Sequence, residues 1–425
     1  MARFVGVIGI VIILGLAFLW SNNRKAINYR LVFTGLALQL ALAIFILKVP
    51  IGQDIFYWLG KAINKLLDFS REGAVFVFGD LTKVTDILPA GVVRSGVFLF
   101  VLLPTIIFVC VLVAMAYHVG LMQRIVAVLA RFVHWAMRVS GSEALSNVAS
   151  AFVGQVEAQI MIRPYLSGMT MSELLASMTG SMACIAGGVM AVYISMGVPA
   201  SYLLAASLMA APGALVISKI VFPETQESET QGTVKLEVKR EYTNIMDAIS
   251  HGASDGMKIS INVIAMLIGV IALVALVDAL LGYFGHFLGW TGVSLNFIGL
   301  DVNNLRLKDV FGAFFSLFAI VMGVPPSESF SVGSLMGTKM VINEFVAYSD
   351  LSPMIGQGLL GAKSIAIASF ALCGFANFSS IAIQLGGIGA MVPQRKADLA
   401  RLGFKAMICG TMASYISASL AGILL

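Results

Sequence analysis

Long stretches without a charged side chain constrain this sequence more than any other feature. Residues 174–218 contain no Asp, Glu, Lys or Arg, and residues 4–23, 31–47 and 95–123 are equally free of them. A helix that crosses a bilayer needs about 20 mainly apolar residues, so the longest stretch must contain two crossings. Only 12% of all residues are charged, about half of what soluble domains carry. The sequence therefore predicts an all-α integral membrane protein.

Basic residues between the apolar stretches predict how the chain is oriented. Lys and Arg gather at residues 24–30, 124–138 and 395–401, and cytoplasmic loops are enriched in these residues. Placing all three groups in the cytoplasm puts both termini outside. The net charge of +5 is then an orientation signal, and we expect no nucleic-acid partner. The pattern predicts eight transmembrane helices, at residues 3–21, 28–48, 93–118, 173–196, 200–220, 257–282, 361–388 and 404–424.

Other apolar segments are too amphipathic or too polar to cross the bilayer. Residues 51–68 repeat apolar side chains near the helical period with lysines between them, which predicts a helix on the membrane surface. Residues 121–138 and 306–322 are predicted interfacial helices. A short polar segment follows each of them, and we interpret these two segments as re-entrant hairpins.

The two hairpins belong to an internal repeat. Each has Ser-Glu near its start and an amide beside a glutamate near its middle, at Gln155 to Glu157 and at Asn343-Glu344. An apolar span with an interior break follows each hairpin, and a further span follows that. The orientation above makes the copies inverted, and interrupted segments in inverted repeats indicate the substrate site of a secondary transporter.

Glu157 and Glu344 are the candidate binding groups in these segments. A carboxylate inside the membrane is costly unless it is paired or serves a polar ligand. Neither has Lys or Arg beside it, and each has an amide nearby, which suits a neutral solute rich in hydroxyls and ring amides. Asn377 and Ser380, in the second broken span, add further polar groups, and Phe375 offers a face for a planar ring.

Three motifs together resemble the concentrative nucleoside transporters, in their bacterial branch: Gly154-Gln155-Val156-Glu157, the run from Asn343 to Tyr348, and the run from Gly374 to Ile381. The resemblance implies a homotrimer in the bacterial inner membrane, with a scaffold and a transport domain that moves like an elevator. It also implies nucleoside uptake driven by sodium or, in some members, by protons. The substrate positions that it implies are Gln155 and Glu157 for the base, Glu344, Asn377 and Ser380 for the ribose, Phe375 and Ile259 beside the base, and Val156 where the family usually has Thr or Ser.

The same resemblance implies a sodium site between the first hairpin tip and the broken fourth span. Val153 and Ile185 would supply backbone carbonyls there. Ser150 stands where many sodium-coupled members have Asn, and Cys184 stands where Ser is usual. A thiol is a soft, poor ligand for a hard cation, so these changes weaken the site or favour proton coupling instead. We expect sodium as the coupling ion, because the backbone ligands do not depend on the side chains.

The expected domain order follows from the repeat. An enzyme is not expected, because no metal motif and no nucleophile-base pair occurs within the spans. A membrane protein that senses nucleosides without transporting them is the alternative of another class. The expected domains are residues 1–118 as scaffold, 119–222 as the first transport repeat, 223–256 as a cytoplasmic loop, 257–305 as a scaffold span and 306–425 as the second transport repeat.

Overall fold

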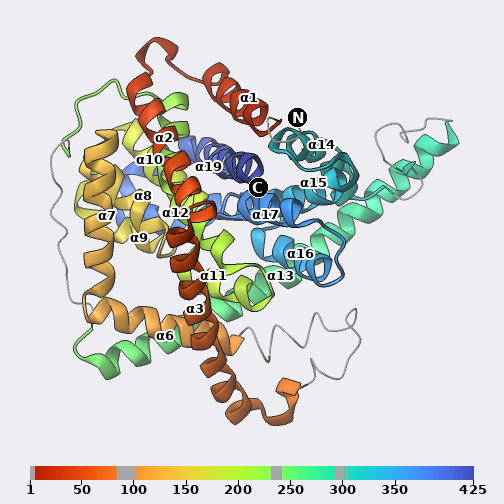
Figure 1. Cartoon of the computed structure of the whole chain (residues 1–425), viewed down its shortest axis with the longest axis horizontal. Helices are drawn as coiled ribbons and strands as arrows, with labels where there is room; N and C mark the ends of the chain where they lie inside the picture. The colour runs from red at the N-terminus through yellow and green to blue at the C-terminus, as the bar shows by residue number, and fades with distance from the viewer. Residues whose placement is uncertain (1–4, 84–99, 101–102, 231–241, 292–300, 303–304) are drawn as a thin grey trace.

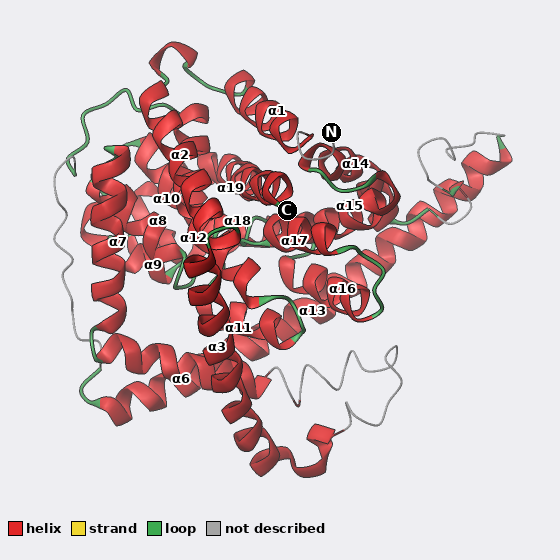
Figure 2. Ribbon diagram, in the orientation of Figure 1, coloured by secondary structure: helices red, strands yellow, loops and turns green. Residues whose placement is uncertain are grey.

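The computed structural model describes the whole chain except residues 1–4, 84–99, 101–102, 231–241, 292–300 and 303–304. The described part consists of helices and connecting loops, without strands (Figure 2). Five helices are long and apolar enough to cross a membrane, or seven if two bent pairs each count as one span. The five are Tyr29–Leu47, Met171–Ser195, Ala200–Val221, Ile271–Trp290 and Pro393–Leu424.

Three helices precede the repeats. Helix α1 is Val5–Leu19 and α2 is Tyr29–Leu47, which begins where the Asn28 side chain accepts a hydrogen bond from the backbone N–H of Leu31. Helix α3 is Pro50–Phe78, ten residues longer at its C-terminal end than the predicted segment 51–68. The buried face of the helix continues past Leu67 through Ser70 and Ala74, although charged residues lie between them.

The first copy of the repeat runs to residue 221. A bend of 74° separates α6 from α7, so the expected interfacial helix turns away from the span before it. The part of the predicted span before residue 103 lies mostly outside the described residues. The helices are α6 Leu103–His118, α7 Leu121–Met137, α8 Gly141–Ser150, α9 Glu157–Ile160, α10 Met171–Ala183, α11 Gly187–Ser195 and α12 Ala200–Val221.

The second copy has the same order of elements, as the sequence predicts. Its first helix, α13, spans 46 residues and begins twelve residues before the predicted span. Helices α14 and α15 bend by 120°, which starts the second hairpin. The helices are α13 Ile245–Trp290, α14 Leu307–Met322, α15 Pro326–Val341, α16 Glu344–Gly356, α17 Ala362–Leu372, α18 Phe378–Met391 and α19 Lys396–Leu424.

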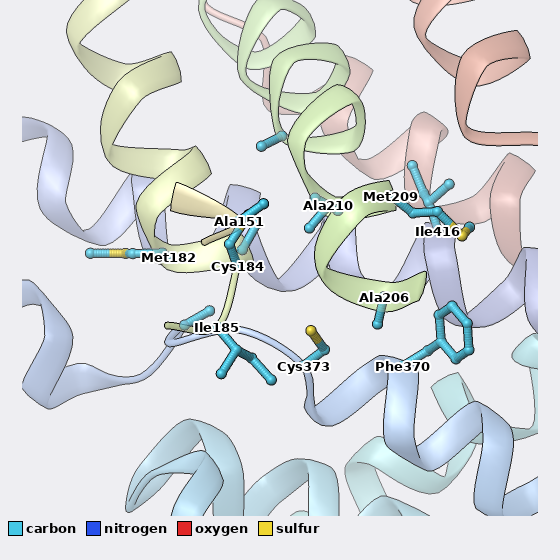
Figure 3. Close-up of a cluster of buried hydrophobic side chains, with 14 of the residues drawn as sticks. Ala151, Met182, Cys184, Ile185, Ala206, Met209, Ala210, Phe370, Cys373 and Ile416 are labelled. Carbon is cyan, nitrogen blue, oxygen red and sulfur yellow. The ribbon is translucent and has the colours of Figure 1, made fainter. Parts of the chain in front are cut away.

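The two broken spans meet at their breaks. The chain between α10 and α11 passes the chain between α17 and α18, with Cys184, Ile185 and Cys373 close together among buried apolar side chains (Figure 3). Gly374 has a φ of +101°, and a Cβ there would collide with the Met182 and Ala183 carbonyls at the end of α10. Only glycine fits both the backbone conformation and the space. This crossing joins the two repeats at the centre of the molecule.

The start of the predicted 223–256 loop packs against the first repeat. The buried Lys219, at the end of α12, forms ion pairs with Glu143 and, at 3.2 Å, with Glu224. Thr170 also donates to Glu224, at 2.8 Å. The loop residues neutralise a buried ammonium, so the first few pack on the repeat although their composition is polar. The end of the predicted loop is helical as well, because α13 already begins at Ile245.

Helices α1 and α2 pack against the repeats. Figure 1 shows α1 beside α14 and α2 across α12, and both also contact α19. The fully buried Gln39 of α2 donates to the Met209 carbonyl at 3.0 Å and to Ser417 at 3.2 Å, on α12 and α19. In contrast, α6 packs mainly along α13. These contacts connect α2 with the last helix of each repeat.

Candidate functional site

Both candidate glutamates are the first residue of a hairpin's second arm. Glu157 begins α9 and Glu344 begins α16. The side chain of Asn343 caps α16 by accepting from the backbone N–H of Val346 at 2.9 Å. Unpaired N–H groups and the helix dipole favour negative charge at such a position. The repeat therefore presents two carboxylates at equivalent places.

Glu344 is buried and held by two side chains from the broken spans. The Tyr193 hydroxyl donates to one carboxylate oxygen at 3.2 Å, and the Asn377 amide donates to the other at 2.9 Å. Tyr193 lies on α11, in the first repeat, and stacks on Tyr348 with ring centroids 4.3 Å apart. Each carboxylate oxygen has two lone pairs, so each keeps acceptor capacity for a ligand hydroxyl.

Asn377 is fixed by capping α18. Its side-chain oxygen accepts from the backbone N–H of Ser380 at 2.9 Å and from the Ser379 hydroxyl at 2.7 Å. The capping bond orients the amide nitrogen of Asn377 toward Glu344. The break in the seventh predicted span thus forms one polar unit with the second hairpin tip.

Gln155 extends this unit to the first hairpin. Its amide nitrogen lies 3.5 Å from the Ser380 hydroxyl, at the limit of a hydrogen bond. Its amide oxygen is buried without a hydrogen-bond partner among the described residues. A buried acceptor without a donor costs free energy, so this oxygen is a place for a ligand to donate. Gln155, Ser380, Asn377, Glu344 and Tyr193 form one chain of polar contacts through both repeats.

Glu157 stands apart from that chain. Its side chain is exposed, and no described residue forms a hydrogen bond or ion pair with its carboxylate. Val156, beside it, is half-buried and packs against Gly387 of α18, where a Cβ would lie 2.6 Å from a Val156 methyl group. The valine therefore closes the gap to α18 with an apolar contact and offers no hydroxyl.

Phe375 and Ile259 supply apolar surface. Phe375 is half-buried in the break that also contains Asn377, so it belongs to the same segment as the polar unit. Ile259 is half-buried on α13, which is part of neither hairpin nor broken span. Phe375 is therefore at the site because it lies two residues before Asn377 in the same break.

The four predicted sodium ligands lie in the first hairpin and at the first break. No described residue donates a hydrogen bond to the carbonyls of Val153 and Ile185, so both remain available to a cation. The side chains of the other two are engaged. Ser150 donates to the Ser146 carbonyl at 2.7 Å, and the Cys184 thiol lies 3.7 Å from the Ser207 carbonyl. The backbone ligands fit a cation better than the side chains do.

Sequence reasoning missed two buried residues of this region. Tyr193 follows the first break within a strongly apolar stretch, where a single tyrosine gives no periodic signal. Lys339 lies in the last turn of the first arm of the second hairpin, where it is 1% exposed. A basic residue predicted inside the membrane is itself a sign of function, and that signal was available for Lys339.

Family models match almost the full length of the chain. Residues 8–81 match the model described as "Na+ dependent nucleoside transporter N-terminus", and residues 202–422 match the corresponding C-terminus model. Residues 99–200, which include the first hairpin, match a model described as "Nucleoside recognition". The members are transporters and not enzymes.

Individual relatives also align with almost the whole chain. It is 40% identical to the uncharacterized transporter YutK of Bacillus subtilis, with 98% of each chain covered. It is 36% identical to the nucleoside permease NupC of Helicobacter pylori, covering 98% of this chain and 96% of NupC. The sodium/nucleoside cotransporter 1 of Homo sapiens is 37% identical over 99% of this chain and 64% of its own.

A solved structure has the same fold. CNTnw in an inward-facing, substrate-bound state superposes with a TM-score of 0.90 at 39% identity, covering 100% of this chain and 98% of CNTnw. A variant of CNTnw in an outward-facing state gives the same TM-score. With family models over most of its length and relatives that match it from end to end, this chain belongs to the Na+-dependent nucleoside transporter family.

Proposed function

We propose that this chain imports nucleosides of the uridine type by symport with sodium, across the plasma membrane of a bacterium. The observation that carries the proposal is the chain of polar contacts from Gln155 to Tyr193, which joins both hairpins and both broken spans. Its groups are one carboxylate, amides and hydroxyls, and no basic side chain forms part of it. Such a set suits a neutral, hydroxyl-rich solute.

The ribose side of the site is Glu344 with Asn377 and Ser380. The Glu344 carboxylate already accepts two hydrogen bonds, and vicinal hydroxyls of a sugar supply further donors. The base side is Gln155 and Glu157, with Phe375 and Ile259 as apolar walls. The buried, unpartnered oxygen of Gln155 and the exposed carboxylate of Glu157 both accept from ring N–H or amino groups. Val156 leaves the base side one hydroxyl short of the usual family pattern.

Sodium is the proposed coupling ion because the carbonyls of Val153 and Ile185 are free of protein donors among the described residues. Backbone carbonyls at helix breaks are natural ligands for a hard cation. Proton coupling is the second candidate. It is favoured by Ser150 and Cys184, whose side chains are bonded within the protein.

The proposed assembly is a homotrimer in which the hairpins and broken spans move as an elevator. Residues 119–222 and 306–425 form the moving unit, and α6 and α13 form the scaffold. We also assign α1 and α2 to the moving unit, unlike the expected scaffold of residues 1–118. Gln39 connects α2 to α12 and α19, and sliding would leave its buried amide unpaired.

Uptake into liposomes tests the function. Labelled uridine should accumulate against its gradient when sodium is higher outside, and unlabelled nucleosides should compete. Uracil lacks the ribose and should compete poorly. Equal competition by uracil and uridine would contradict the ribose assignment. Binding of uridine without accumulation under any cation gradient would instead support a sensor.

A further inference from the structure

At the break of the second broken span, a charged side chain from the second hairpin lies where the first repeat has its candidate cation ligands. Lys339 lies in the last turn of α15, and its ammonium donates to the carbonyls of Ala371 at 3.0 Å and Cys373 at 3.2 Å. These carbonyls belong to the C-terminal end of α17, where the span breaks. The end of a helix carries partial negative charge, so the ammonium stabilises it.

The equivalent elements of the first repeat hold the proposed sodium ligands. Ser150 is the last residue of α8, and Cys184 and Ile185 follow the end of α10. In both copies the end of a hairpin's first arm thus meets the end of a half-helix: the arm supplies proposed ligands in the first repeat and the ammonium in the second. The arms lead to Glu157 and Glu344, which are equivalent as the first residues of α9 and α16.

We propose that Lys339 is a tethered cation that takes, in the second repeat, the place that a free sodium ion takes in the first. This inference rests on the proposed function in one respect, which is that sodium binds at the break of the first repeat. The second repeat carries its cation covalently, so only the first has a place for a cation that enters and leaves. Lys339 is a positioning residue, because it fixes the carbonyls that precede Phe375 and Asn377.

The Lys339 ammonium is buried, and its hydrogen-bond partners are carbonyl oxygens. Lys339 is 1% exposed, and no described carboxylate lies within ion-pair distance of its nitrogen. Its known partners are the two carbonyl oxygens, which are typical ligands of a cation rather than of an anion-pairing lysine. Ser414 of α19 also donates to the Cys373 carbonyl, at 2.8 Å, and so holds it from the other side.

Chemical rescue tests the proposal. Lys339→Ala removes the ammonium and leaves space beside the two carbonyls. The purified variant should unfold at a lower temperature than wild type, and ethylammonium chloride or sodium chloride should raise its Tm toward the wild-type value. Tetramethylammonium chloride, which is too bulky and donates no hydrogen bond, controls for ionic strength. Wild type should show no response to ethylammonium beyond this control.

Lys339→Met is the matched variant, since it fills the volume without charge. It should have a lowered Tm that ethylammonium does not raise. A Met variant with wild-type Tm and uptake would overturn the proposal, as would a folded Ala variant that no cation stabilises. If the Ala variant does not fold, Lys339→Arg is compared with Lys339→Met: folded protein only from Arg supports the proposal, and equal recovery from Met overturns it. These Tm and folding measurements test Lys339 whether or not sodium is the coupling ion. The coupling ion is tested separately by uptake into liposomes.

Discussion

The amide of Asn377 donates to the carboxylate of Glu344 across 33 residues of sequence, at 2.9 Å. The bond joins the N-cap residue of α18 to the first residue of α16. A buried carboxylate held in this way is ready to bind a hydroxyl without rearranging.

Replacing Glu344 by Gln should weaken uridine binding roughly tenfold or more. The amide keeps the shape but replaces one acceptor oxygen by a donor, and each lost bond to a buried partner costs about 1–3 kcal/mol. Binding of labelled uridine to purified protein measures the effect. Asp54→Asn, on the exposed side of α3, is the control and should bind like wild type. Unchanged binding by the Glu344 variant would remove this residue from the ribose site.

Replacing Tyr193 by Phe should have a smaller effect. It removes the hydroxyl that donates to Glu344 and keeps the stack on Tyr348. The loss of one hydrogen bond of about 0.5–1.5 kcal/mol predicts a roughly threefold to tenfold weaker uridine affinity. Tyr202→Phe provides the matched control, because that ring packs near Phe370 and its hydroxyl is no part of the site. Equal effects of both changes would show that Tyr193 acts through packing alone.

Replacing Ser150 by Asn should lower the sodium concentration that gives half-maximal uptake. The longer side chain carries a carbonyl oxygen, a hard ligand, toward the carbonyls of Val153 and Ile185. Cys184→Ser should act in the same direction, and the double variant should respond most. Uptake measured over a sodium series gives the result. Uptake that is independent of the sodium concentration in all variants, and that increases with an inward proton gradient, would support the proton alternative.

Replacing Gly374 by Ala should lower the Tm and abolish most uptake. A side chain at a φ of +101° is strained by about 1–3 kcal/mol, and its Cβ would displace the carbonyl end of α10. Gly386→Ala is the matched control, since a Cβ there meets no atom within 4 Å in the same region of the chain. That change lies inside α18 and should leave the Tm equal or slightly higher. A Gly374 variant as stable as the control would mean that the crossing tolerates a side chain.

The sequence predicts the hairpins, the breaks and both glutamates because polar residues stand out against apolar surroundings. It does not predict the length of α3 or α13, since charged residues in an amphipathic helix resemble the end of a helix. It places Glu224 in a cytoplasmic loop, because composition alone cannot show that Lys219 lies buried beside it. Tyr193 and Lys339 were missed for a related reason. Tyr193 contacts Glu344 151 residues away and Lys339 contacts carbonyls more than 30 residues away, and no local pattern records such contacts.

The crossing of the two breaks also determines when the site can exist during synthesis. Ser380 is made 225 residues after Gln155, its neighbour in the folded chain. Gly374 likewise follows long after the carbonyls of α10 that it covers. Until then the first break lies in the bilayer with backbone groups that lipid cannot satisfy. We expect this half-made chain to be the stage of biogenesis most dependent on the insertion machinery, because the ribosome must deliver the second repeat before the first is complete.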